Sequence, residues 1–225
     1  MKVDPATLSA DAAYFWQAAT ILPRPIAWTS TLNEDGSANL APFSFFTGVS
    51  SDPPTLLICV GRRKRRPADR VGEAQLAAPS PSRGDGDPLG VPEKKDTWRN
   101  IERTGEFVVH VVNDALGPQM NATSRDVPYG TDEFAAVGLT KLACEKVAPP
   151  RIAEAPVAME CRLDRIIEIG RGGTAVIIGE IVLWHVRDEL VVEGRLDLGR
   201  LDAIGRMGGP SYTRTRDRFD MTRPK

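Results

Sequence analysis

The chain alternates between apolar and polar residues in short runs that predict β-strands more often than helices. The clearest run is Ile26–Thr31, which is followed by a turn at Gly36, a residue free to adopt positive φ, and by a return strand from about Ala38. Pro42 lies in this second strand and has no backbone N–H, so it requires a strand edge, a bulge or a strand end. Each of these leaves nearby amides and the Ser44 hydroxyl available to a ligand.

Further strands are expected along the rest of the chain. Thr55–Val60 is a continuous apolar run, typical of a strand buried on both faces, and Phe107–Val112 is rich in β-branched residues. Met159–Leu163 alternates apolar with charged residues, a register change at 166–167 indicates a bulge, and Thr174–Val186 returns as a long apolar strand. Because hairpins prevail, the pattern predicts a mainly β fold, an antiparallel barrel with peripheral helices.

Helix signals are fewer and stand beside the predicted strands. Helices are expected at 11–19, 97–104, 131–137 and over part of 115–124. Ser9 is the predicted N-cap of the first helix and Asp96 of the second. The aromatic side chains of Tyr14, Phe15 and Trp16 in the first helix are expected to pack onto the barrel.

Composition limits the classes of protein that need to be considered. With 225 residues, 41% of them hydrophobic, the chain can bury the core of one domain, 1–225. Its net charge of −1 and pI of about 6.2 give no overall attraction to nucleic acid or to an anionic membrane. Cys59, Cys144 and Cys161 are odd in number and widely spaced, which fits buried thiols in a reducing cytoplasm. No signal peptide or transmembrane run is apparent, so we expect a soluble cytoplasmic protein.

The stretch 62–93 differs in composition from the rest of the chain. It begins with the basic run Arg62–Arg66 and continues with many Ala, Pro, Ser, Gly and Asp residues, which predicts a flexible insertion. The basic run has two functional interpretations, a nucleic-acid patch or a clamp for the phosphate of a nicotinamide cofactor. The simpler interpretation is a solvated loop, which we favour over nucleic-acid binding.

Several motifs, which together cover most of the chain, occur in the same order as in one known family. The chain is similar to the flavin reductase-like, FMN-binding split-barrel family of the flavoredoxin type. The matching segments are Arg24–Ser30, Asn39–Phe46, Ser50–Gly61, Lys95–Val112, Met120–Ser124, Arg195–Gly209 and Tyr212. The resemblance implies a Greek-key antiparallel split barrel, FMN as cofactor, NADH or NADPH as reductant, and a homodimer whose second subunit partly walls the flavin groove. In that family a shorter connection precedes the Lys95 segment, so the 62–93 stretch is a departure.

An FMN site needs a polar strand edge, an apolar wall and a receptor for the phosphate. The polar candidates are Thr29, Ser30, Asn39, Ser44 and the backbone from Ala41 through Phe43 to Phe45. The flat apolar candidates are Trp28, Pro42, Phe45 and Phe46. The residues alone favour an ordinary barrel strand whose aromatic side chains fill a core; the resemblance reverses this and favours the cofactor site.

The phosphate candidates lie at a predicted helix start. Lys95 and Thr97 place an ammonium and a hydroxyl beside unsatisfied helical amides, and the resemblance gives both a site role, with Asp96 as a structural cap. Asn121 and Ser124 either border the phosphate or cap a turn.

A C-terminal segment, 195–225, is expected to close over the flavin with Arg206 and Tyr212. We interpret the three arginines beyond it as a solvated edge or frayed tail: Arg214, Arg216 and Arg218. His110 and His185 lie in predicted apolar strands, which favours core or edge imidazoles over metal ligands or catalytic bases. No metal site is predicted.

The expected reaction is hydride transfer from NADH or NADPH to FMN, with electrons passed to a monooxygenase or other protein partner, to free flavin or to iron. No side chain needs to act as acid or base. The chain contains no Rossmann, Walker or nucleophile-elbow motif. A non-catalytic FMN-binding electron carrier is the alternative; oxidation of a pyridoxine phosphate shares the barrel but matches these motifs less well. A nucleic-acid binder and a membrane protein are not expected.

Overall fold

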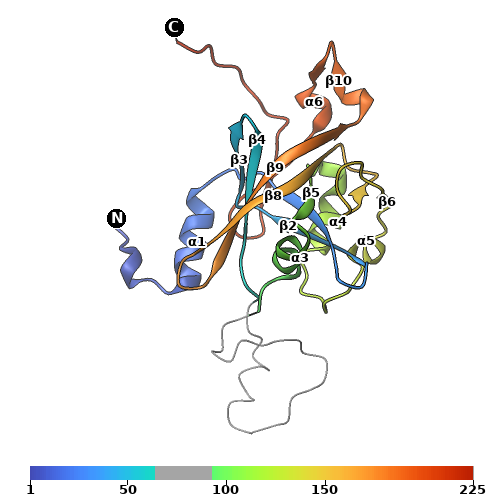
Figure 1. Cartoon of the computed structure of the whole chain (residues 1–225). Helices are drawn as coiled ribbons and strands as arrows, with labels where there is room; N and C mark the ends of the chain where they lie inside the picture. The colour runs from blue at the N-terminus through green and yellow to red at the C-terminus, as the bar shows by residue number, and fades with distance from the viewer. Residues whose placement is uncertain (64–92, 225) are drawn as a thin grey trace.

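A seven-stranded antiparallel sheet, in the order β2-β1-β5-β8-β9-β4-β3, dominates the computed structural model (Figure 1). The structure describes residues 1–63 and 93–224. The strands of the sheet are β1 Ala27–Leu32, β2 Ala38–Phe43, β3 Phe46–Ser51, β4 Pro54–Val60, β5 Glu106–His110, β8 Val157–Ile169 and β9 Thr174–Val186. This arrangement confirms the expected mainly β, antiparallel fold.

Shorter elements surround this sheet. Three two-stranded ribbons are β6 Lys141–Leu142 with β7 Arg151–Ile152, β10 Val191–Val192 with β11 Arg195–Leu196, and β12 Ile204–Arg206 with β13 Tyr212–Arg214. The helices are α1 Ala10–Thr20, α3 Asp96–Thr104, α4 Gly117–Ala122, α5 Glu133–Ala136 and α6 Leu198–Leu201, with 3-10 turns at Pro5–Thr7, Asp114–Leu116 and Asp188–Leu190. Within the described residues, no helix has the length and apolar character to cross a membrane.

The two edge strands of the sheet are neighbours in the chain. β2 ends at Phe43 and β3 begins at Phe46, so only Ser44 and Phe45 join one edge of the sheet to the other. A seven-stranded sheet can have its edges this close only if it curls, and the result is a barrel with a seam between β2 and β3. The Phe45 carbonyl accepts a hydrogen bond from the Cys59 amide (2.8 Å), which ties the seam to β4.

The first hairpin follows the sequence prediction closely. Gly36 has φ +83°, and the strands pair from Ala27 opposite Phe43 to Leu32 opposite Ala38. The amide of Leu40 points away from β1, and since directions alternate along a strand, position 42 also faces outward. Pro42 therefore removes no hydrogen bond from the ladder, and its place on an edge strand is as predicted.

In the long β8–β9 hairpin the bounds of β9 agree with the prediction, but β8 extends beyond the predicted Met159–Leu163 and the bulges do not lie where they were expected. The register shifts fall at Glu160/Cys161 and at Leu163/Arg165, not at 166–167. Gly179 lies opposite Leu163, where a Cβ would overlap the ring of Phe107, so the ring takes the space of a missing side chain. The tight packing of Phe107 against β9 thus depends on glycine at this position.

The prediction for β4 was partly wrong, because burial alternates along this strand. Leu56, Ile58 and Val60 are buried while their neighbours are half-buried. The buried three join Trp98 and Phe107 in one core cluster. A second cluster, on the other side of β1 and β2, contains Trp28, Leu40, Met120, Phe134 and Ile204.

The predicted packing of the first helix was partly wrong. Ser9 caps α1 as expected, accepting a hydrogen bond from the Ala12 amide (3.2 Å). However, Tyr14, Phe15 and Trp16 are 56%, 60% and 38% exposed, and Ala18 is the buried residue of the helix. The ring of Phe15 is therefore largely exposed, whereas that of Tyr14 meets the Phe45 ring at the seam, with 6.1 Å between the ring centres.

The predicted role of Asp96 also needs correction. Lys95 is the N-cap of α3, and the Asp96 carboxylate accepts two hydrogen bonds from Arg63 (2.7 and 2.8 Å) instead of capping the helix amides. Gly105 ends the helix with φ +70°, as expected. The capping rule considers only neighbouring residues, and it could not predict that Arg63, more than thirty residues earlier in the chain, would bind the Asp96 carboxylate.

Arg214 and Arg216 lie on a solvated edge, one of the two predicted alternatives, and are held there by ion pairs. Arg214 and Arg216 both contact Asp114 (2.8 and 3.0 Å), and Arg216 also contacts Asp202 (2.7 Å).

Two arginines of the basic run Arg62–Arg66 lie within the described residues, and both have carboxylate partners. Arg62 contacts Glu168 (2.9 Å), and Arg63 contacts Asp96. The rest of the run, with nearly all of the expected insertion, lies outside the described residues.

Candidate functional site

A cavity of about 730 Å³ opens at the barrel seam, beside α1, the start of α3, the end of α4 and the β12–β13 ribbon. Its volume lies within the range typical of small-molecule and cofactor sites. Twelve of the fifteen residues predicted to bind a cofactor line it: Asn39, Ala41, Pro42, Phe43, Ser44, Phe45, Lys95, Thr97, Asn121, Ser124, Arg206 and Tyr212. The fold thus brings together residues that are up to 173 positions apart in the sequence.

The other three predicted residues, Trp28, Thr29 and Ser30, are fully buried in β1 and are not among the residues that line the cavity. Trp28 Nε1 donates to Thr123 Oγ1 (2.9 Å), Ser30 Oγ donates to the Pro150 carbonyl (2.6 Å), and Thr29 Oγ1 bonds the Ala27 carbonyl (3.3 Å). β1 lies between β2 and β5, so its polar groups are used inside the protein. We therefore assign these three residues to the core.

The outer edge of β2 is partly used by a buried carboxyl group. The Leu40 amide donates to Glu133 Oε2 (2.5 Å), and Glu133 lines the cavity. Burial raises the pKa of Glu133 to about 8, with the nearby Asp96 charge acting in the same direction. At neutral pH the Glu133 side chain is therefore mostly neutral, and the cavity wall carries one negative charge fewer than its composition indicates.

Arg24 organises the seam, and sequence reasoning did not single it out. Its guanidinium is buried, donates to Ser44 Oγ (3.2 Å) and lies 5.7 Å from the centre of the Phe45 ring. It also donates to the carbonyls of Ala18 (2.5 Å), Ile21 (2.8 Å) and Met207 (3.0 Å). One side chain thus joins α1, the seam and the end of β12. Its place between two prolines was the one available signal in the sequence.

At the other end of the cavity, polar side chains meet the N-terminus of α3. Asn39 Nδ2 donates to Thr97 Oγ1 (3.0 Å) and to Thr31 Oγ1 (3.1 Å), and all three residues are buried. Asn39 therefore acts as a connector that fixes the Thr97 hydroxyl at the cavity wall. Since Thr97 accepts from Asn39, its own hydroxyl hydrogen remains to be donated.

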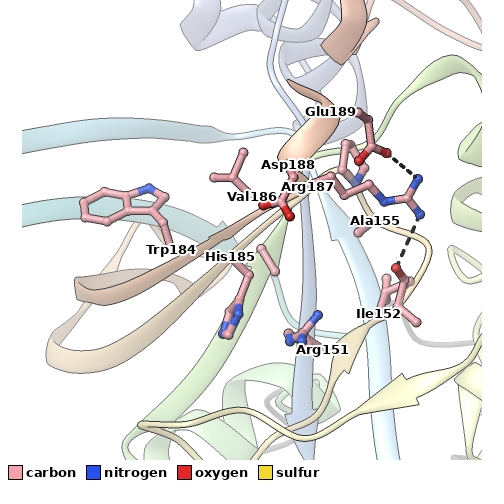
Figure 2. Close-up of a pocket in the computed structure, with 12 residues that line it drawn as sticks. Arg151, Ile152, Ala155, Trp184, His185, Val186, Arg187, Asp188 and Glu189 are labelled. Carbon is pink, nitrogen blue, oxygen red and sulfur yellow. Dashed lines mark hydrogen bonds and ion pairs between the residues drawn. The ribbon is translucent and has the colours of Figure 1, made fainter. Parts of the chain in front are cut away.

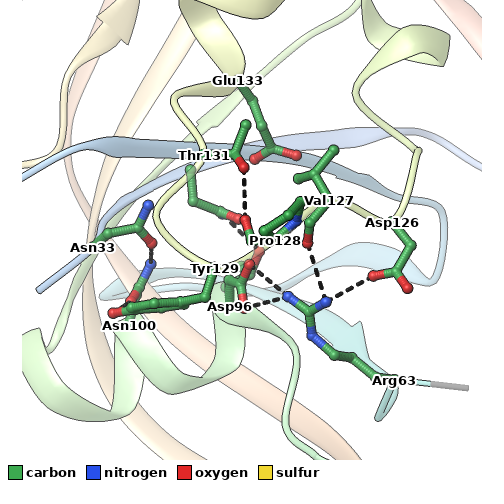
Figure 3. Close-up of polar contacts among 12 residues, drawn as sticks. Asn33, Arg63, Asp96, Asn100, Asp126, Val127, Pro128, Tyr129, Thr131 and Glu133 are labelled. Carbon is green, nitrogen blue, oxygen red and sulfur yellow. Dashed lines mark hydrogen bonds and ion pairs between the residues drawn. The ribbon is translucent and has the colours of Figure 1, made fainter. Parts of the chain in front are cut away.

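Arg63 is the second residue that sequence reasoning missed, and it determines the charge at this end (Figure 3). It holds Asp96 through two hydrogen bonds and also donates to Asp126 (2.8 Å) and to the Val127 carbonyl (3.2 Å). Burial alone lowers the pKa of Arg63, but the bonds and charge of Asp96 raise it further, so the net shift is upward. The pairing neutralises Asp96 at the point where Lys95 and the α3 amides meet the cavity.

The C-terminal ribbon forms a further wall. Arg206 and Tyr212 pair across β12 and β13, and the Arg206 guanidinium lies 4.5 Å from the centre of the Tyr212 ring. Tyr212 Oη donates to Asn121 Oδ1 (3.3 Å), which connects this wall to α4. Ser124 Oγ donates to the Asn121 carbonyl (2.6 Å), so Ser124 is tied to the last turn of that helix and also lines the cavity.

The two histidines have different environments. His110 is buried; its Nδ1 contacts the Trp28 carbonyl (2.8 Å) and its Nε2 accepts from the Ile152 amide (3.0 Å). Burial lowers its pKa to about 4, so it is a neutral imidazole of the core, as predicted. His185 lies elsewhere, against Glu160, and away from this cavity.

The fold and the site define a class of protein, a split antiparallel barrel with a pocket at its seam that is aromatic at one end and cationic at the other. Comparison with known proteins identifies the class further: the chain belongs to the family of the flavin reductase like domain, whose model matches residues 19–198. This confirms the resemblance seen in the sequence.

Individual relatives agree with this family. A protein of Deinococcus radiodurans is 36% identical over 228 residues, which cover 98% of this chain and 88% of the relative. The structure of nitrilotriacetate monooxygenase component B from Bacillus cereus superposes with a TM-score of 0.83 at 27% identity and covers 98% of both chains. That of the 2-nitrobenzoate 2-nitroreductase from Pseudomonas fluorescens gives 0.79 at 29% identity and covers 100% of this chain and 96% of that one.

Proposed function

We propose that the seam cavity binds FMN and that the protein is an oxidoreductase that uses NADH or NADPH. When bound, FMN supplies the redox chemistry: it accepts reducing equivalents from the nicotinamide and passes electrons to a protein partner, free flavin or iron. The observation that carries this proposal is the cavity itself, in which an aromatic β-edge and the N-terminus of α3 face one space. Family membership supports it.

The cationic end of the cavity fits a phosphate group. Lys95 and the hydroxyl of Thr97 stand at the start of α3, where the first amides of a helix have no helical partner and attract anions. The pairing of Asp96 with Arg63 removes the repulsion that an unpaired carboxylate would exert on a phosphate. These residues would hold the cofactor by its tail.

The other end fits a flat ring. Phe45 and Pro42 offer apolar surface, while the hydroxyl of Ser44, oriented by Arg24, offers a polar contact at the same edge. Arg206 supplies a positive charge on the opposite wall, where it would stabilise negative charge on a reduced ring. No residue is required to act as acid or base in this scheme.

A non-catalytic FMN carrier is the second candidate, because the sequence has no dinucleotide fingerprint that would mark a nicotinamide site. The name of the Bacillus cereus structure, a component of a monooxygenase, instead supports a reductase that serves a separate oxygenase. We also propose a cytoplasmic location, which the three free cysteines support.

We further propose a homodimer in which α1 contacts the second copy. Tyr14 lines the cavity and meets Phe45 edge-on, with 6.1 Å between the ring centres, yet Tyr14, Phe15 and Trp16 leave a contiguous run of aromatic surface exposed. A partner subunit that covered these rings would also complete the cavity wall. Sedimentation of the wild type and of a Phe15→Glu variant tests this: a dimer that becomes monomeric in the variant supports it, and a monomeric wild type rejects it.

The visible absorption of protein purified without added flavin, followed by titration of the flavin-free form with FMN, tests the cofactor. Rapid anaerobic mixing of the loaded protein with NADH and NADPH then separates the two candidates. Bleaching at enzymatic rates, on the order of 1 s⁻¹ or faster, supports the reductase. Much slower bleaching supports the carrier, and protein that binds no FMN rejects both.

A further inference from the structure

A second cluster of reactive side chains lies outside the flavin cavity. Cys144 precedes the loop that leads to β7, Glu160 lies on β8 and His185 lies on β9. The Cys144 sulfur, a Glu160 oxygen and a His185 ring nitrogen are all within 4.8 Å of one another. None of the three residues lines the seam cavity, so the flavin site does not explain why they converge.

Glu160 is the fixed point of this cluster. The residue is fully buried, and its carboxylate accepts hydrogen bonds from three successive amides, those of Glu145 (2.9 Å), Lys146 (2.6 Å) and Val147 (3.1 Å). A buried carboxylate is costly unless it is well bonded, and these bonds hold its oxygens in one orientation. The loop that provides them also carries Cys144, so carboxylate and sulfur are positioned together.

His185 completes the cluster and connects it to solvent. Its Nε2 lies 2.5 Å from Glu160 Oε1. The same imidazole lines a second cavity, of about 500 Å³, whose wall also includes Trp184 and Arg187 (Figure 2). The His185 side chain is 17% exposed, so a small ion or water can reach it from this cavity. The cluster is therefore neither sealed in the core nor fully open.

We propose that Cys144, Glu160 and His185 form a Zn²⁺ site with water as the fourth ligand. Sulfur, imidazole nitrogen and carboxylate oxygen are the ligands that Zn²⁺ takes, usually four in a tetrahedron. The ion takes the place on Glu160 Oε1 that His185 occupies now. His185 then binds through Nε2 with its proton on Nδ1, and the Cys144 thiol proton leaves to solvent.

The site goes beyond the proposed flavin function and does not depend on it. It joins the loop after β6 to the central hairpin β8–β9, so bound metal would stabilise the folded chain. Without metal the same residues form a hydrogen-bonded clasp, in which Glu160 simply anchors the loop. The two descriptions differ at Cys144: in the clasp it is a thiol hydrogen-bonded to Glu160, and in the metal site it is a thiolate ligand.

The test is a titration of tag-free, chelator-treated full-length protein with Zn²⁺ against a chromophoric competitor, with and without FMN. We expect one Zn²⁺ per chain, and Co²⁺ in its place should give thiolate-to-cobalt absorption. Cys144→Ser and His185→Gln should each weaken binding at least 100-fold, while Cys59→Ser, which changes a cysteine of the seam, should bind as the wild type does.

Thermal unfolding supplies a second readout that does not require the variants to match in stability. Zn²⁺ should raise the melting temperature of the wild type and of Cys59→Ser but not that of Cys144→Ser. Stoichiometric binding that survives Cys144→Ser and His185→Gln, or a wild type that takes up no Zn²⁺ at micromolar concentration, overturns the proposal and leaves the clasp. Because the same measurements are made without FMN, failure of the flavin proposal would not affect the outcome.

Discussion

Glu133 and Glu160 are both buried carboxyl groups, and the protein treats them in opposite ways. Burial raises the pKa of Glu133 to about 8. Within the described residues, the Leu40 amide is the one group that donates a hydrogen bond to this carboxyl, and it offsets only part of the effect of burial. Burial also acts to raise the pKa of Glu160, but His185 and the amides of the 145–147 loop reverse the shift, and the pKa lies below its usual value. Glu160 accepts hydrogen bonds from three amides and contacts His185, whereas Glu133 accepts one, and the additional bonds favour the charged form of Glu160.

The difference in charge between Glu133 and Glu160 matches the surroundings of each residue. Glu133 lines the seam cavity, where a neutral carboxyl leaves the cationic end free to attract an anion. Glu160 faces Cys144 and His185, where a carboxylate is suited to a cation. Each carboxyl therefore has the charge that its proposed ligand requires.

The largest effect is expected from Glu160→Gln. The substitution removes the charge and places an NH₂ group where an oxygen now faces backbone N–H groups, so buried donors lose their acceptor. We expect the free energy of unfolding to fall by about 3 kcal/mol, measured by urea unfolding at pH 7 in chelator. Glu189→Gln, at an exposed carboxylate, should change it by less than about 0.5 kcal/mol. A loss below about 1 kcal/mol at Glu160 would show that the carboxylate is not essential to the loop.

Glu133→Gln should change the pH dependence of stability. The folded pKa of Glu133 is higher than its unfolded value, so its contribution is complete below pH 4.5 and is lost as pH rises to about 8. Gln can still accept the Leu40 bond but does not titrate. The difference in unfolding free energy should therefore move in favour of the variant by more than about 1.4 kcal/mol between pH 5 and pH 8. Urea unfolding across this range measures it, and a difference that stays constant with pH contradicts the assignment.

Local features of the fold were the ones that the sequence could predict. The turn at Gly36, the cap at Ser9 and the span of β9 depend on backbone preference and periodicity within a few residues. Burial of Trp28, Thr29 and Ser30 does not, because it follows from the strands that pair with β1 on both sides. The Arg24–Ser30 motif led us to predict that these residues line the pocket, and their place in the core becomes apparent only from the order of the strands in the sheet.

Long-range partners were beyond the reach of sequence reasoning for a similar reason. Arg63 takes Asp96 from its expected capping role, and Arg24 binds carbonyls on α1 and at Met207. A guanidinium has five donors and a long side chain, so its partner is set by the fold and not by spacing. The exposure of the aromatic rings on α1 was not predicted, because an apolar helix face indicates burial but does not identify the surface that buries it.

Arg63→Met extends the comparison to the flavin cavity. Without Arg63, the Asp96 carboxylate is unpaired beside Glu133 and at the start of α3. FMN affinity should fall by about tenfold, by fluorescence titration, because the unpaired charge repels the phosphate. Adding Asp96→Asn should restore most of the affinity, since it removes the charge that Arg63 neutralises. No recovery in the double variant would place the contribution of Arg63 elsewhere.

The smallest effect separates the two strands of the first hairpin. Ser44→Ala removes a hydroxyl at the cavity that Arg24 orients, whereas Ser30→Ala removes one that is bonded to the Pro150 carbonyl in the core. The first change should weaken FMN binding about fivefold and leave the unfolding free energy of flavin-free protein nearly unchanged. The second should lower that free energy by about 1 kcal/mol with FMN affinity kept. A serine hydroxyl thus has a binding role at the edge of the sheet and a structural role one strand inward. If both substitutions weakened FMN binding equally, the pocket would not lie where we propose.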